Sequence, residues 1–187
     1  MMSWFQLAQL AFALFVAAVI AERMRALHWH LASSDEAVRW LVRELASEDR
    51  TQARAWAEAR PDAQAARVVI AATSVDADEG AMRELLLDLR DEATARLPLI
   101  RVAATLGSTL GLLGGILTLT GVLTPAAGLL ALKAGAVERL SMEQAVATMA
   151  IGVATSATCF QGLALLRPAA QKLIAQAQQI AAVVASS

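Results

Sequence analysis

The chain has 187 residues, of which 57% are hydrophobic, 18% are charged and only 4% are aromatic. A soluble domain usually carries about a quarter of charged residues, so this composition argues against a single soluble fold. The net charge of −1 without a basic stripe excludes nucleic acid as an expected partner, and the one cysteine, Cys159, excludes an intrachain disulfide.

Three stretches of the chain contain no Asp, Glu, Lys or Arg: residues 1–21, 102–132 and 144–166. About 20 apolar residues cross the hydrocarbon core of a bilayer as one helix. These stretches are expected to be helices, because lipid cannot form hydrogen bonds with the backbone N–H and C=O groups. The sequence therefore predicts an all-α, polytopic membrane protein with three transmembrane helices and long cytoplasmic helical extensions.

The first predicted element is a transmembrane helix over residues 1–22. Trp4 and Phe5 stand at one end of it, as interfacial aromatic residues do. A cleaved signal peptide is the alternative, but its basic residues would precede the apolar run. Here Arg23 and Arg25 follow the run, so we expect a retained, plain apolar anchor.

Residues 23–97 are predicted to form a cytoplasmic helical region. Ser34 is expected to cap one helix, and further helices are expected from about 62 to 73, with Pro61 in the first turn, and beyond Gly80. Their apolar stripes are too narrow for membrane spans and too few for a separate globular core. We expect these helices to pack on one another or on neighbouring subunits.

The second span is predicted over residues 98–123. Pro98 either begins this helix or bends a longer one. Gly107, Gly111 and Gly115 are spaced by four residues and line one side of the span. Small residues at this spacing let the backbones of membrane helices approach closely.

A short periplasmic loop is predicted over residues 124–143, a third span over 144–167 and a cytoplasmic C-terminal helix over 168–187. The third span repeats the spacing of four at Thr148, Gly152 and Ser156. Two interpretations are open for these small residues: tight packing within one subunit, or the wall of an oligomeric pore.

Basic residues predict the orientation, because Lys and Arg concentrate in cytoplasmic loops. Residues 22–101 hold twelve Arg, whereas residues 123–144 hold only Lys133 and Arg139. The N-terminus and the loop between the second and third spans are therefore expected outside, and the long region and the C-terminal tail inside.

No carboxylate lies in the middle of any span, although intramembrane carboxylates are the usual proton-relay groups. Hydroxyls are frequent in the second and third spans. They either bond to carbonyls of their own helix or line a water-filled path, where they replace part of the hydration of an ion. If protons cross here, a partner must supply the titrating carboxylate.

Two motifs carry a family resemblance. In LPLIRVAATLGSTLGLLGGILTLTGVL, residues 97–123, the runs Gly107-Ser108-Thr109 and Leu112-Leu113-Gly114 are followed by Thr118 and Gly121. These residues resemble the second-span signature of the proton-channel family that contains MotA, TolQ and ExbB. Residues 143–160, EQAVATMAIGVATSATCF, are similar to the third-span pattern of that family. The three-span layout resembles TolQ and ExbB rather than the four-span MotA.

The sequence also departs from the family pattern. Gly111 stands where the family usually has proline, and Thr148 lies one residue before the family's third-span threonine, a position that Met149 takes here. The alternative to a channel is therefore a non-conducting membrane scaffold or assembly subunit with the same fold.

The resemblance implies a channel-forming subunit of a motor or energy-transducing complex driven by the proton-motive force. Such subunits form a pentamer in the bacterial inner membrane, with the N-terminus periplasmic and the C-terminus cytoplasmic. The pentamer surrounds single-span partners resembling TolR or ExbD, each with a membrane aspartate. By this resemblance Thr118 and Thr148 lie on the proton pathway. The expected helix-packing residues are Gly107, Gly111, Gly115, Gly121, Gly152 and Ser156.

Neither an enzyme nor a cofactor or metal site is expected from the sequence. It has no His, Glu and Cys constellation typical of a metal site, no nucleophile paired with a base, and no phosphate-binding glycine loop in the region predicted to be cytoplasmic.

Overall fold

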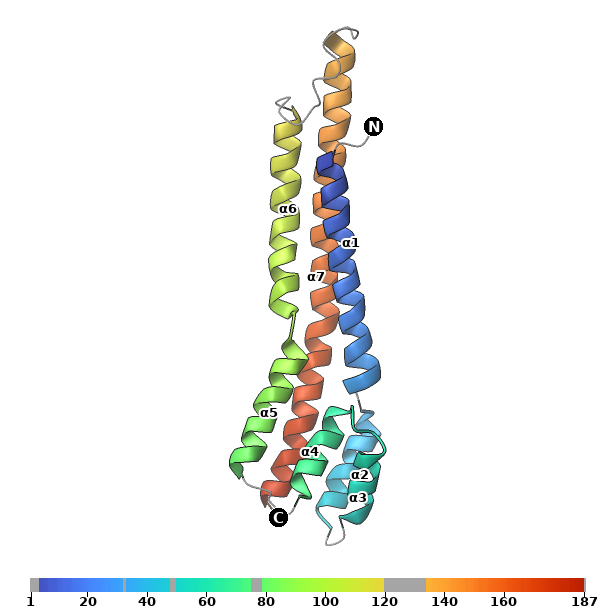
Figure 1. The fold of residues 1–187 in the computed structure, drawn as a ribbon, viewed down its shortest axis with the longest axis vertical. Helices are drawn as coiled ribbons and strands as arrows, with labels where there is room; N and C mark the ends of the chain where they lie inside the picture. The colour runs from blue at the N-terminus through green and yellow to red at the C-terminus, as the bar shows by residue number, and fades with distance from the viewer. Residues whose placement is uncertain (1–3, 32, 48–49, 75–78, 120–133, 187) are drawn as a thin grey trace. The chain divides into compact units, whose positions relative to one another are not determined.

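The computed structural model describes residues 4–31, 33–47, 50–74, 79–119 and 134–186. These residues form helices joined by short turns, and none of them forms a strand (Figure 1). The elements are α1 (Trp4–Arg25), the π-helix η1 (Ala26–Leu31), α2 (Asp35–Leu45), α3 (Thr51–Glu58), α4 (Gln64–Ala72), α5 (Glu79–Thr94), α6 (Leu97–Leu119) and α7 (Ala134–Ser186).

Three helical segments are long and apolar enough to cross a membrane: Trp4–His28, Glu79–Leu119 and Met142–Val184. Their apolar windows have mean hydropathies of 2.0, 1.7 and 1.6. The predicted fold class, an all-α polytopic protein with three candidate spans, is therefore confirmed. Its orientation in the bilayer stays a prediction.

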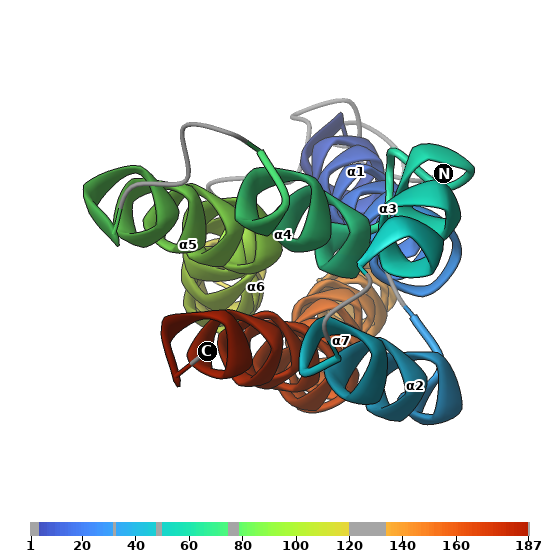
Figure 2. The ribbon, with the colours of Figure 1, turned by 90° about the horizontal axis from the view of Figure 1, so that it is seen from below.

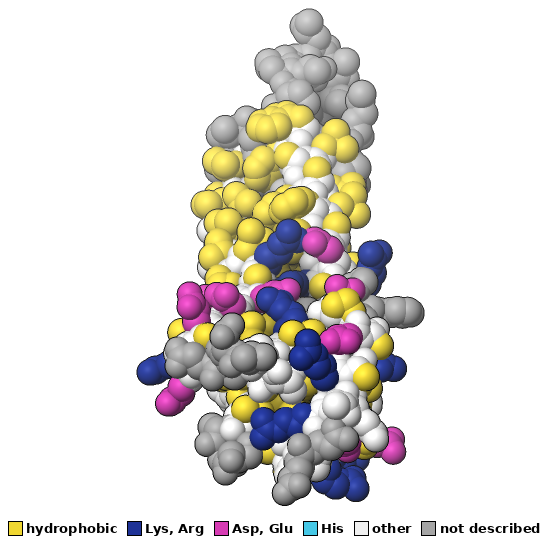
Figure 3. Space-filling model, turned by 60° about the horizontal axis from the view of Figure 1, so that its bottom comes forward, with side chains coloured by type: hydrophobic (Ala, Val, Ile, Leu, Met, Phe, Trp, Pro, Cys, Tyr) yellow, Lys and Arg dark blue, Asp and Glu magenta, His cyan; other side chains and the backbone are white. Residues whose placement is uncertain are grey.

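The chain divides into two compact units. Unit 1 contains Met1–Ala21 and Leu97–Ala164, and unit 2 contains Glu22–Arg96 and Leu165–Ser187. On the face drawn in Figure 3, hydrophobic side chains cover unit 1 and the charged side chains gather over unit 2. This separation follows from the charge-free stretches of the sequence, which supply the helices of unit 1.

Unit 2 has a hydrophobic core of its own, to which the helices of residues 23–97 and the C-terminal part of α7 both contribute. The expectation of too few stripes for a separate core concerned residues 23–97 alone and did not include that part of α7. Buried residues of α2, α3, α4 and α5 meet the C-terminal part of α7, where Ala177, Ile180 and Ala181 are buried. Figure 2 shows these five helices lying around one another. Each stripe alone is short, but five stripes together enclose a core. The expectation that the helices pack on one another is confirmed.

The turns of unit 2 follow local sequence signals. Ser34 caps α2, and its hydroxyl accepts a hydrogen bond from the Ala37 N–H at 3.1 Å, as predicted. Pro61 differs from the prediction, because it lies in the turn before α4, whose N-cap is Ala63. Arg96 has a φ of 65° and separates α5 from α6. Pro98 consequently lies in the first turn of α6, where its missing N–H costs no helical bond.

Helix α7 is longer than the sequence indicated. It begins at Ala134, so residues 134–143 of the predicted loop are helical, whereas residues 124–133 lie outside the described part of the chain. It also continues through Pro168, so the predicted third span and C-terminal helix are one element. A proline inside a helix costs about 3 kcal/mol. Burial of Leu173, Ala177 and Ile180 beyond it offsets that cost.

Candidate functional site

Helices α6 and α7 pack through their glycines. A methyl group placed on Gly152 would lie 2.5 Å from the Gly111 Cα and 2.6 Å from the Gly107 carbonyl oxygen. A methyl group on Gly111 would lie 2.8 Å from the Gly152 Cα. Both contacts are with backbone atoms, so no side-chain rotation relieves them. The two backbones therefore approach so closely that only glycine fits, which favours tight packing within one subunit, one of the two interpretations that the spacing of four left open.

Two further glycines make room for side chains rather than for backbone. A methyl group on Gly115 would collide with the Met149 side chain, and one on Gly114 would collide with the Phe5 ring and the Thr148 methyl. Gly114 therefore brings α1, α6 and α7 together. Gly121, the remaining predicted packing residue, lies outside the described residues.

The two threonines expected on the proton pathway are buried inside unit 1. Thr118 is 5% exposed and Thr148 is 1% exposed. The Thr118 hydroxyl donates to the Gly114 carbonyl at 2.7 Å, and the Thr148 hydroxyl donates to the Gln144 carbonyl at 2.7 Å. Both side chains thus lie next to Gly114. In this structure they face neighbouring helices of the same chain rather than its surface.

Ser156 links α6 and α7 by a hydrogen bond. Its hydroxyl donates to the Ala104 carbonyl of α6 at 2.5 Å, and both groups are buried. In contrast, the Thr155 hydroxyl donates to the Ile151 carbonyl of its own helix at 2.8 Å. The predicted packing role of Ser156 therefore has a specific physical basis, a polar bond between helices beside the glycine contact.

Two glutamines of α1 belong to this site, although sequence reasoning treated the first span as a plain apolar anchor. Gln6 Nε2 donates to the Thr148 hydroxyl at 3.3 Å and to the Gln144 carbonyl at 3.2 Å. Gln9 is 7% exposed, and neither its amide nitrogen nor its amide oxygen has a hydrogen-bond partner in the described part of the chain. The available signal was two amides three residues apart, which share a helix face.

One exposed stripe of α7 within unit 1 carries mostly small side chains. Its exposed positions at helical spacing are Glu143, Ala147, Ala150, Ala154, Ala157, Gln161 and Ala164. Beside this stripe, α7 exposes the large side chains of Met142, Val146, Val153 and Phe160. The exposed surface of α6 likewise carries large side chains such as Leu106, Leu110 and Leu113. The stripe of small residues on α7 is therefore suited to helix contact, whereas the large exposed side chains of both helices are suited to lipid.

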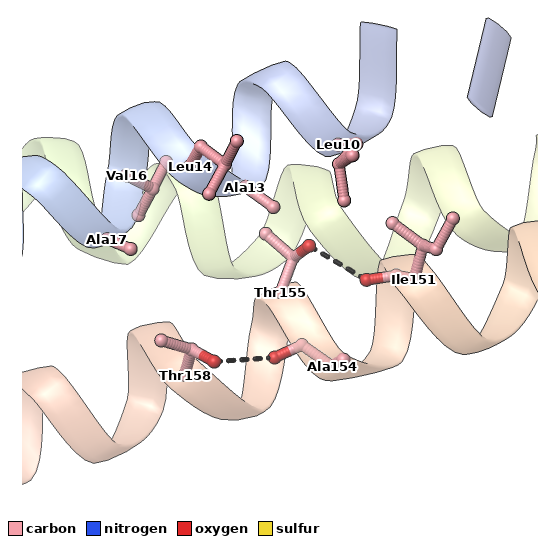
Figure 4. Close-up of a pocket in the computed structure, with 9 residues that line it drawn as sticks. All are labelled: Leu10, Ala13, Leu14, Val16, Ala17, Ile151, Ala154, Thr155 and Thr158. Atoms are coloured by element: carbon pink, nitrogen blue, oxygen red, sulfur yellow. Dashed lines mark hydrogen bonds between the residues drawn. The ribbon is translucent and has the colours of Figure 1, made fainter. Parts of the chain in front are cut away.

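A groove of about 280 Å³ lies between α1 and α7. Figure 4 shows that Leu10, Ala13, Leu14, Val16 and Ala17 of α1 face Ile151, Ala154, Thr155 and Thr158 of α7. The two hydroxyls in this lining donate to carbonyls of α7, Thr158 to Ala154 at 2.9 Å and Thr155 to Ile151. The groove is consequently apolar over most of its wall.

The part of the chain that the structure describes contains no cluster of side chains typical of a metal site. No group of three or more His, Cys, Asp or Glu side chains there could hold a metal ion. The polar groups described at the site are hydroxyls, amides and backbone carbonyls.

No family model, curated protein or solved structure matches the chain. The resemblance to the MotA, TolQ and ExbB family thus rests on the motifs in residues 97–123 and 143–160 and on the three-span layout. Membership of that family stays a prediction.

Proposed function

We propose that this chain is a channel-forming subunit of a complex driven by the proton-motive force in a bacterial inner membrane, of the TolQ and ExbB type. The resemblance of its second and third spans supplies the function. The all-α fold with three candidate spans is compatible with it. The structural observation that carries the proposal is the small-residue surface of α7, which runs from Glu143 to Ala164.

A surface of this kind is suited to other helices rather than to lipid. Alanines allow helix backbones to approach closely, and such contacts drive association in a bilayer. Gln161 lies in the charge-free stretch 144–166, and an exposed amide there is costly unless it meets a polar partner. We therefore assign this surface to neighbouring subunits and to a single-span partner that supplies the membrane aspartate.

A second candidate, a non-conducting scaffold, is favoured by a different observation. Thr118 and Thr148 are buried, and their hydroxyls are bonded within the chain. Proton transfer past them requires the packing around Gly114 to open. A scaffold requires no such opening.

The test is purification in mild detergent, followed by reconstitution of whatever complex is obtained in liposomes with a pH-sensitive dye. The channel proposal expects a single-span protein with an aspartate in or near its span to co-purify, and proton influx under an applied potential. A homo-oligomer without influx contradicts the channel and supports the scaffold.

Thr118→Val removes the buried hydroxyl with little change in shape, and the channel proposal expects it to lower the influx several-fold. Thr158→Val is the matched control, because it removes an exposed hydroxyl that is likewise bonded to its own helix. Unchanged influx in an assembled Thr118→Val complex would remove Thr118 from the pathway.

A further inference from the structure

Unit 2 contains a cluster of charged side chains whose members are Glu22, Arg23, Arg67, Glu92 and Arg96. Glu22 and Arg23 directly follow the charge-free stretch 1–21, and Arg96 directly precedes α6. Charged residues at the ends of apolar spans lie at the level of the lipid headgroups. The cluster is therefore placed where the phosphates of a bilayer are found.

Two of the three arginines in this cluster have a carboxylate partner. Arg67 Nη1 donates to Glu92 Oε2 at 2.5 Å, and Arg96 Nη1 donates to Glu22 Oε2. Arg23 differs from both, because its Nε and Nη2 groups are buried and neither has a hydrogen-bond partner in the described part of the chain. A buried guanidinium without an acceptor costs free energy, since nothing replaces the water that it has lost.

The charges near Arg23 do not balance its own. Glu92 and Glu22 attract the guanidinium and Arg96 repels it. Both carboxylates already bond another arginine, so three guanidinium groups share two carboxylates and the cluster keeps one positive charge. Arginine does not lose its proton in proteins, so titration of Arg23 cannot remove this excess. An additional anionic acceptor lowers the free energy of the cluster instead.

A phosphodiester has the chemistry that this position requires. It carries a single negative charge and unesterified oxygens, to which a guanidinium donates two parallel hydrogen bonds. Basic sites beside membrane helices bind the headgroups of anionic lipids in this way. A zwitterionic lipid brings a positive charge together with its phosphate, so the excess charge of the cluster favours an anionic lipid.

The cluster is open to such a headgroup. The side chains of Arg96 and Glu22 are 49% and 63% exposed. Arg23 is itself only half-buried, so rotation of its long side chain brings Nε and Nη2 to an oxygen at the surface. The ion pair between Arg96 and Glu22 stays intact in this arrangement.

We propose that Arg23, together with Arg96, binds the phosphodiester of an anionic phospholipid at the end of the first span. Arg23 donates its unpaired N–H groups to the unesterified oxygens, and Arg96 adds positive charge. The bound headgroup joins the end of α1 to the turn between α5 and α6, where Arg96 lies. This inference does not depend on ion conduction, so its failure and the failure of the proposed function are separate results.

Lipid binding to the full-length protein in mild detergent tests the site. The delipidated protein is mixed with phosphatidylglycerol, phosphatidylethanolamine or inorganic phosphate, and followed by native mass spectrometry and thermal unfolding. Phosphatidylglycerol is expected to stay bound and to raise the unfolding midpoint, because a ligand of the folded state stabilises it. Phosphatidylethanolamine is expected to bind on the order of tenfold more weakly. Equal binding of the two lipids, or equal stabilisation by inorganic phosphate, overturns the anionic lipid as the occupant.

Arg23→Gln is expected to lower the affinity for phosphatidylglycerol on the order of tenfold, because it removes charge-assisted hydrogen bonds. Arg25→Gln is the matched control, since it makes the same change of charge at an exposed position in the same last turn of α1. Equal losses of affinity in the two variants would mean that positive charge in general attracts the lipid, and would overturn the site at Arg23.

Stability without lipid separates binding from a purely structural role. Arg23→Gln removes an uncompensated buried charge, so the delipidated variant is expected to unfold at the same temperature as the wild type or above it. A lower midpoint with unchanged lipid affinity would assign Arg23 to the internal structure of unit 2 and overturn the proposal. Arg23→Lys keeps the charge and lacks the planar fork, so it serves where Arg23→Gln fails to fold. Its affinity is expected to fall several-fold, and wild-type affinity would overturn the binding geometry.

Discussion

The backbone contact between Gly111 and Gly152 leads to a quantitative prediction for Gly152→Ala. The added methyl carbon would lie 2.5 Å from the Gly111 Cα, about 0.9 Å short of the 3.4 Å at which ordinary contact begins. Since both contacting groups are backbone, α6 and α7 must move apart. A gap of this size forfeits a quarter to a half of the dispersion attraction along the interface.

The expected loss of stability is the difference between a packing cost and a gain in helix propensity. Overpacking of this kind costs about 3 kcal/mol at the upper end of its usual range. Replacing glycine by alanine inside a helix stabilises that helix by about 1 kcal/mol. Gly152→Ala is therefore expected to lower the free energy of unfolding by about 2 kcal/mol, which raises the unfolding constant about 30-fold.

Gly162→Ala is the matched control. Its methyl carbon would lie 2.8 Å from Cδ1, 3.0 Å from Cγ2 and 3.1 Å from Cγ1 of Ile20, all of them side-chain atoms that a rotation of Ile20 can move. The cost of that rotation is about 1 kcal/mol, and the gain in helix propensity of about 1 kcal/mol cancels it. The two variants and the wild type would be unfolded by titration with dodecyl sulfate in mixed micelles, followed by far-ultraviolet circular dichroism. Equal stability of Gly152→Ala and Gly162→Ala would refute the reasoning.

Two further predictions concern single polar contacts. Ser156→Ala removes the bond to the Ala104 carbonyl and is expected to cost about 0.6 kcal/mol in the same titration; Thr155→Ala, which removes only a bond within α7, should cost less. In unit 2, a hydrogen bond from Lys172 is the main cause that lowers the pKa of Asp35. Folding is therefore stabilised above the ordinary Asp pKa, and this stabilisation is lost as pH falls from about 5 toward 3. Thermal unfolding should show a smaller acid-induced decrease in midpoint for Asp35→Asn than for the wild type, and an equal decrease would contradict the assignment.

The spans and some of their packing could be predicted from the sequence because the bilayer imposes strong local constraints. Hydrocarbon thickness sets the length of an apolar helix, so the charge-free stretches located three candidate spans. Spacing by four placed Gly107, Gly111 and Gly115 on one helix face. The residues that these glycines contact on α7 could not be predicted from spacing, because the contact between Gly111 and Gly152 depends on the register of two helices.

The core of unit 2 was not predictable because it is assembled from residues far apart in sequence. Val38 and Leu41 of α2, Ala66 of α4 and Leu89 of α5 meet Ile180 of α7. Each stripe alone buries too little apolar surface to hold a fold. The stabilisation arises only when the C-terminal part of α7 returns beside the others, and no local pattern encodes that return.

The contacts of the α1 glutamines could not be predicted from the sequence for a related reason, and these contacts change the role of that helix. Averaged over a span, two amides hardly alter hydropathy, yet Gln6 finds its partner Thr148 at a distance of 142 residues along the chain. The same register places Ile20 against Gly162. Polar bonding at one end and close packing at the other fix α1 against α7 over most of a span. Because α1 also places Phe5 against Gly114 beside Thr148, any movement that opens the packing around the two predicted pathway threonines must displace α1 as well. In the proposed channel, the first span would therefore act together with the second and third spans rather than as an anchor alone.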